Sequence, residues 1–134
     1  MRDVDTLARW HAFVASGDVA ILDEILADDV EFRPPTYWKA RHGKLEAALI
    51  LGTVAGVFED FRYHREWVDG SDWALEFTAR VGALSLKGVD LVRLDDEGKI
   101  AEFEVVARPP NAVAALRAEM EERLRPLLDL APES

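Results

Sequence analysis

In the first part of the chain, apolar residues recur every three or four positions, which is the spacing of one face of a helix. The first run starts near Leu7 and ends at Gly17, a residue that commonly stops a helix. Asp18 is placed to cap a second run, which stops at the acidic pair Asp28 and Asp29. Two consecutive amphipathic helices are therefore predicted.

A short strand is predicted at residues 30–33, because Pro34 and Pro35 follow it and cannot continue a strand or a helix. Residues 36–43 are predicted to be a loop. An apolar third helix is predicted from residue 44 to about residue 58.

From residue 60 the apolar period changes from 3.6 to 2, which is typical of strands. The acidic, glycine-containing segments 69–72 and 95–98 are hairpin turn signals and indicate antiparallel neighbours. Asn111 is placed to cap a last helix. Four strands are predicted in this region: about 61–68, 72–81, 84–94 and 99–107.

The length and composition fit one globular domain. The chain has 134 residues and is 49% hydrophobic, so we predict a single domain over 1–134 with a helical extension over 111–130. With 16 basic and 26 acidic residues, the formal net charge is -10, which disfavours nucleic acid and anionic membranes as partners.

The chain has no cysteine, which excludes disulfides, thiolate metal sites and a cysteine nucleophile. Its first residues do not have the pattern of a secretory signal, so a cytoplasmic location is expected. The histidines at 11, 42 and 64 lack the spacing of metal ligands. We therefore expect neither a metal nor a cofactor.

Four short segments, in their order and spacing, resemble the NTF2-like superfamily, and within it the SnoaL-like proteins related to polyketide cyclases and ketosteroid isomerases. These segments are 15–18, 26–32, 88–90 and 95–100, and the resemblance spans residues 7–108. It implies an α+β cone in which three N-terminal helices pack on a curved antiparallel sheet, followed by a C-terminal helix. It also implies an internal, mostly apolar cavity, and a homodimer formed through the outer face of the sheet.

Strand alternation assigns residues to the cavity. Trp73, Leu75 and Phe77 share one face of their strand, and Phe103 has the equivalent parity in the last strand. Together with residues of the first helix and of the loop after the first strand, the predicted lining is Trp10, Tyr37, Trp38, Trp73, Leu75, Phe77 and Phe103.

Asp90 is the main candidate for acid–base chemistry. It shares parity with Gly88 and Val92, on the face that we predict to be buried. A carboxyl group in an apolar cavity has a raised pKa and can donate a hydrogen bond or transfer a proton. The alternative is a solvated or hydrogen-bonded structural acid.

The resemblance to ketosteroid isomerases is incomplete at the site. The strand position of Asp90 matches that of their carboxylic acid, which is held neutral so that it can donate a hydrogen bond. Trp10 stands where they have a tyrosine donor, and Pro34 stands about where they have the catalytic base. Proline cannot accept a proton.

Weaker candidates are two histidines and two rings. His11 is either an acid–base group near the cavity or a core histidine, and His42 is either an acid–base group or a solvated loop residue. Tyr37 and Trp38 either stack on a ligand at the cavity mouth or cover the core or a subunit contact.

The sequence leaves the function open between three hypotheses. The first is an uncharacterised SnoaL-like protein that binds a small apolar molecule and catalyses isomerase, lyase or hydrolase chemistry with Asp90. The second is a non-catalytic module for the same ligand class. The third is a dimeric assembly protein whose own side chains fill the cavity.

Overall fold

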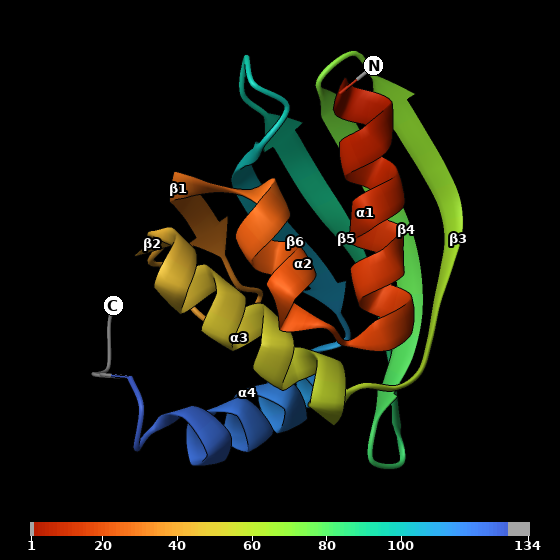
Figure 1. The fold of residues 1–134 in the computed structure, drawn as a ribbon. Coiled ribbons are helices and arrows are strands. Elements are labelled where there is room, and N and C mark those ends of the chain that lie inside the picture. Colours follow the sequence, from red (N-terminus) through yellow and green to blue (C-terminus); the bar gives the residue numbers. More distant parts are fainter. Residues whose placement is uncertain (1, 129–134) are drawn as a thin grey trace.

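The computed structural model describes residues 2–128, and the side chains of residues 5–128. Four helices and six strands follow one another along this part of the chain (Figure 1). The helices are α1 (Arg2–Ser16), α2 (Val19–Ile25), α3 (Lys44–Val57) and α4 (Pro110–Leu124). The strands are β1 (Leu26–Arg33), β2 (Arg41–His42), β3 (Glu59–Asp69), β4 (Asp72–Val81), β5 (Leu84–Leu94) and β6 (Ile100–Arg108).

The strands form one six-stranded sheet in the order β2-β1-β6-β5-β4-β3. Strands β3 to β6 are a meander of antiparallel neighbours. Strand β1 pairs with β6 in parallel, so the prediction of an antiparallel sheet holds for every neighbouring pair except this one. The parallel pair arises because β2, α3 and the strands β3 to β5 separate β1 from β6 and return the chain in the same direction.

The helices cover one face of the sheet, and the other face is open (Figure 1). Helix α4 packs against α3 and closes one end of the molecule. Strand β3 bends around the outside of α1, and its pairing with β4 is interrupted twice, between Glu59 and Arg62 and between Tyr63 and Glu66. Such bulges increase the local bend of a strand, so they help the sheet to wrap around the helices.

Apart from shifts of one or two residues in β3 and β6, the structure differs from the sequence prediction at three places. Helix α2 ends at Ile25 and β1 already starts at Leu26, because Leu26 and Ala27 are buried in the sheet. The expected loop 36–43 contains β2, which pairs with the end of β1. Helix α4 begins at Pro110 instead of after Asn111, and a proline at the first helical position has no hydrogen bond to lose.

The alternation predicted for the meander is present in the structure. Trp73, Leu75 and Phe77 face the helices and are buried, whereas the intervening positions of β4 are on the outer face of the sheet. Within residues 2–128, no helix combines the length and the apolar character required to cross a membrane.

Candidate functional site

A cavity of about 140 Å³ lies between the helices and the inner face of the sheet. Its wall is mostly aromatic and aliphatic and comes from α1, α3, α4, all six strands and the loop after β1. The aromatic residues of the wall are Trp10, Phe13, Phe32, Tyr37, Phe58, Phe61, Tyr63, Phe77 and Phe103. The ionisable side chains of the wall, apart from its two tyrosines, are Arg41, Asp90 and Glu121.

Asp90 lies in the middle of β5, on the face that points to the helices. Its exposed fraction is only 4%, and its strand neighbours are Leu75 on β4 and Val105 on β6. The strand leaves little room here, because a Cβ atom on Gly88 would lie 2.5 Å from the ring of Phe77. The packing of three strands therefore holds the carboxyl group against the cavity wall.

A chain of two hydrogen bonds connects Asp90 to α1. The Tyr63 hydroxyl donates to Asp90 Oδ2 at 2.5 Å, and the Trp10 indole Nε1 donates to the Tyr63 oxygen at 2.8 Å. Both of the donors are thus used inside the protein. Asp90 is part of the cavity wall, and no side chain of the described residues donates to its Oδ1.

Burial changes the acid–base properties of this pair. Loss of solvent raises the pKa of Asp90 from 3.8 to about 7, although the hydrogen bond from Tyr63 acts in the opposite direction. Burial and the neighbouring Asp90 carboxyl also raise the pKa of Tyr63 well above its usual value. At neutral pH, Asp90 therefore exists in both protonation states, while Tyr63 stays a neutral donor.

A second polar cluster stands at another part of the wall, where α4 meets the loop after β1. The Tyr37 hydroxyl donates to Glu121, and the Arg117 guanidinium lies 4.3 Å above the Tyr37 ring. Arg117 also bonds to Glu121 at 3.1 Å. These contacts fix Tyr37 over the cavity and connect the loop to α4.

The structure places the seven predicted lining residues in three different environments. Trp10, Tyr37, Phe77 and Phe103 line the cavity. Trp73 and Leu75, which precede Phe77 in β4, are buried in the core but lie outside the wall. Trp38 differs most from the prediction, since it is 83% exposed and points away from the cavity.

The two candidate histidines also lie outside the cavity wall. His11 forms an ion-pair contact with Glu66 at 3.0 Å and meets the edge of the Tyr63 ring, with the two ring centres 5.3 Å apart. His42 is exposed on β2. Within the part of the chain that the structure describes, no group of acidic or histidine side chains could hold a metal ion.

Tyr63 is the site residue that the sequence analysis missed. It lies between Arg62 and His64, in a strand whose charged residues suggest a solvated outer face. Phe61 and Tyr63 do alternate with Arg62 and His64, and this was the available signal for an inner face. The bulge that follows Tyr63 hides the pattern, because it shifts the register of the rest of the strand.

The sequence profile of the SnoaL-like domain matches residues 7–103 of the chain. This match covers most of the chain and both ends of the Trp10–Tyr63–Asp90 network. The chain belongs to the SnoaL-like domain family. It is therefore also a member of the NTF2-like superfamily, as its fold indicates.

Two solved structures are similar to this SnoaL-like chain over nearly its whole length. An uncharacterised Silicibacter pomeroyi protein with a cystatin-like fold is 48% identical, with a TM-score of 0.86 over 90% of this chain and 85% of that one. A steroid delta-isomerase from Pseudomonas aeruginosa is 44% identical, with a TM-score of 0.90 over 94% of this chain and 93% of that one.

A more distant NTF2-like protein of unknown function from Mesorhizobium loti shares only the fold. It is 18% identical, with a TM-score of 0.73 over 81% of this chain and 92% of that one. No curated protein matches the chain. The comparisons thus give the SnoaL-like chain a family and a fold.

Proposed function

We propose that this SnoaL-like chain binds a small, mainly apolar molecule in the cavity and exchanges a proton with it through Asp90. The observation that carries the proposal is a buried carboxyl group with a pKa of about 7, held by Tyr63 against an aromatic cavity. Efficient acid–base groups have a pKa near the working pH, because both protonation states must be accessible during turnover.

The size of the cavity limits the part of the ligand that is enclosed. A volume of about 140 Å³ is close to that of an apolar cavity that holds one benzene molecule, about 150 Å³. The buried part of the ligand is therefore about one ring in size. The aromatic wall favours an unsaturated or alicyclic ring over a charged or strongly polar group.

The hydrogen bond from Tyr63 determines where the exchangeable proton lies. Because Tyr63 donates to Oδ2, a proton taken up by Asp90 is on Oδ1, toward the cavity. In its ionised form, Oδ1 accepts a proton from a carbon next to a ligand carbonyl, and the C–H electron pair moves into the carbonyl as an enolate. The same O–H then returns the proton to another carbon of the enolate system.

The similarity to a steroid delta-isomerase supports this type of reaction, since moving a double bond requires removal and return of a proton. The cavity wall lacks one group that the resemblance to ketosteroid isomerases implies, the separate catalytic base. Pro34, which stands about where the ketosteroid isomerases have their base, is in the wall and cannot accept a proton. Asp90 has to perform both steps.

Non-catalytic binding is the alternative, and the hydrogen-bond network favours it in one respect. The Trp10 and Tyr63 donors are both engaged inside the protein, so neither is free to stabilise an enolate oxygen. In that case Asp90 acts only as the hydrogen-bonding anchor for a ligand hydroxyl or carbonyl group.

A single-ring β,γ-unsaturated cyclohexenone tests both functions. Binding is followed by NMR shifts of the cavity residues, and turnover by the ultraviolet absorption of the conjugated product. Asp90→Asn preserves the shape of the side chain and the acceptor for Tyr63, so we expect binding to remain and turnover to fall by about a hundredfold or more. His42→Asn is the control and keeps the wild-type rate, since His42 is exposed outside the wall.

The outcomes separate the hypotheses. Binding without turnover in the wild type supports the non-catalytic module. Turnover that is equal in the wild type and in Asp90→Asn contradicts the catalytic role of Asp90. Absence of any binding at millimolar concentration of the ketone contradicts the proposal that the cavity accepts a ligand of this class.

We further propose that the chain forms a homodimer through the outer face of the sheet. Trp67, Leu91 and Val106 on this face are 50%, 41% and 53% exposed. Cross-strand pairs place Ala74 beside both Trp67 and Leu91, so apolar side chains continue across the face. An exposed apolar surface with charged residues around it is typical of an interface between subunits.

A further inference from the structure

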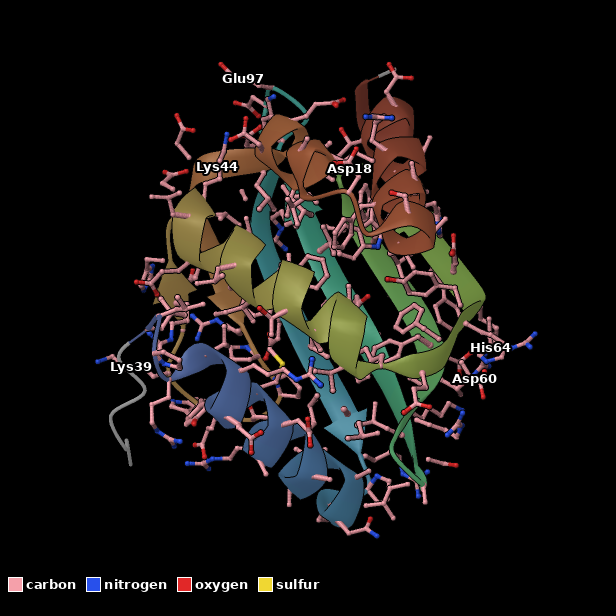
Figure 2. All side chains as sticks on the ribbon, turned by 60° about the horizontal axis from the view of Figure 1, so that its bottom comes forward. Asp18, Lys39, Lys44, Asp60, His64 and Glu97 are labelled. Carbon is pink, nitrogen blue, oxygen red and sulfur yellow. The ribbon has the colours of Figure 1, made fainter. Side chains whose placement is uncertain are left out.

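A groove of about 510 Å³ lies on the outer face of the sheet, separate from the cavity. It is found where β3 begins and where β6 ends, and Figure 2 shows Asp60 and His64 together at this edge of the molecule. Its ionisable side chains are four cations and one acid: Arg62, Arg80, Lys87, Arg108 and Asp60. This is an unusual surface for a chain with a net charge of -10.

The strand pairing brings the cations together. Arg62 is opposite Thr78, Thr78 is opposite Lys87, and Lys87 is opposite Arg108. These four residues form one row across β3, β4, β5 and β6 on the same face of the sheet. Because neighbouring strands are about 4.8 Å apart, the row is about 14 Å long at the backbone.

Two of the cations are already oriented by acidic side chains. Arg80 bonds to Asp60 at 2.9 Å, and Lys87 bonds to Glu76 at 3.0 Å. Arg62 and Arg108 are exposed and form no ion pair with the acidic side chains of the described residues. Lys87 and Arg108 are direct neighbours of like charge, and the Glu76 carboxylate offsets the charge of Lys87 alone, so a bound anion would be attracted to Arg108.

The groove contains two cation pairs. Arg62 lies diagonally across from Arg80, and Lys87 lies directly across from Arg108. Arginine side chains match the oxygens of phosphate with paired N–H donors, and lysine adds a point charge. The Thr78 and Ser85 hydroxyls in the groove wall add further donors.

We propose that this groove binds the diphosphate or phosphate group of a small molecule. Its volume is within the range of small-ligand sites, about 300 to 1,000 Å³. The charge of the remaining surface favours a short anion, because the net charge of -10 repels a long polyanion such as nucleic acid. The inference is independent of the cavity and of its proposed function.

Pyrophosphate and inorganic phosphate are the probes, titrated into the full chain at about 0.15 M ionic strength, where remote charges are screened. Binding is followed by calorimetry and by NMR shifts. Pyrophosphate is expected to bind more tightly than phosphate, because it can contact both cation pairs. In the double variant Arg62→Gln with Arg108→Gln, the affinity for pyrophosphate should fall by about tenfold or more, since charge-assisted hydrogen bonds are lost.

The matched control is Arg33→Gln with Arg93→Gln. It removes the same charge from the same face of the sheet, at positions outside the groove whose arginines pair with Glu31 and Asp72. This variant is expected to bind pyrophosphate within about twofold of the wild type, because the lost charges are remote and screened by salt.

Three results would overturn the proposal. In the first, the wild type does not bind pyrophosphate. In the second, both double variants lose the same affinity for pyrophosphate. In the third, the groove variant binds pyrophosphate as tightly as the wild type does. Sedimentation of both variants provides a further check. If the groove variant alone changes the oligomeric state, its arginines belong to a subunit contact and the phosphate site is rejected.

Discussion

At the scale of single residues, two buried acids of the sheet have pKa values that are shifted in opposite directions. Asp90 and Glu76 are both buried, with exposed fractions of 4% and 5%. Glu76 faces outward, where hydrogen bonds from Arg65 and Lys87 keep its pKa far below the usual value. Asp90 faces an apolar cavity with a neutral tyrosine, so its pKa rises to about 7. Burial raises the pKa of Asp90, whereas at Glu76 the bonds to two cations outweigh the effect of burial.

The raised pKa of Asp90 predicts a specific dependence of stability on pH. Its pKa is about 7 in the folded chain and near the ordinary 3.8 in the unfolded chain, so the folded state holds the proton more tightly. Ionisation therefore favours unfolding, and stability is lost as the pH rises from about 4 to about 7. At about 1.4 kcal/mol for each pKa unit, the total loss is about 4 kcal/mol.

This loss can be measured by urea unfolding of the wild type and of Asp90→Asn across that pH range. The asparagine variant has no proton to lose, so the difference between the two unfolding free energies isolates Asp90 from all other titrating groups. We expect the wild type to become less stable relative to the variant up to about pH 7 and the difference to stay constant above it. Parallel pH profiles would show that Asp90 is solvated.

At the scale of elements, Gly88 controls how closely β5 packs on its neighbours. A Cβ atom there would lie 2.5 Å from the Phe77 ring and 2.8 Å from the carbonyl oxygen of Val106. The backbone oxygen cannot move without distortion of the β5–β6 pairing. We expect Gly88→Ala to lower the free energy of unfolding by about 1–3 kcal/mol, as overpacked core substitutions do.

The control for this substitution is Gly56→Ala in α3. Gly56 has no atom within 4 Å of an added Cβ. Alanine favours the helix by up to about 1 kcal/mol over glycine, so this variant should be slightly more stable than the wild type. Chemical denaturation of both variants tests the argument, and a neutral effect of Gly88→Ala would contradict the tight packing beside Asp90.

The elements show why some boundaries could be predicted and others could not. The strands 72–81 and 84–94 match β4 and β5 to the residue, because alternation and turn residues agree there. The start of β1 at Leu26 was missed, since a short apolar run reads equally well as the end of a helix. β2 has only two residues and depends on pairing with β1, which no local pattern encodes.

The same limit applies to the candidate site. Asp90 could be assigned to the inner face by parity alone, because the pairing of β5 is regular from Leu84 to Arg93 on its β4 side and from Lys87 to Arg93 on its β6 side. Its partner could not, because the contact between Tyr63 and Asp90 joins two strands that are separated by β4 in the sheet. Trp38 was assigned to the mouth because aromatic loop residues often cover cavities, but its loop turns it outward.

At the scale of the whole molecule, one face of the sheet lines the cavity and the other is exposed. The inner face carries the aromatic wall and Asp90. The outer face is uncovered by helices in the chain and carries apolar side chains at its centre (Figure 1). Leu91 is the central residue of this surface, since its strand neighbours are Ala74 and Glu104. A second copy of the chain would bury it.

The subunit contact predicts opposite results for two exposed leucines. Leu91→Lys places a charge in the proposed interface and is compatible with its own sheet, because Glu104 lies opposite. Leu45→Lys is the control, since Leu45 is 88% exposed on α3, in the layer of helices. In sedimentation at micromolar concentration, we expect Leu91→Lys to be a 15.0 kDa monomer and Leu45→Lys to remain a dimer like the wild type.

A wild type that sediments as a single 15.0 kDa species excludes the dimer. If both variants stay dimeric, the subunits meet through a surface other than the outer face of the sheet.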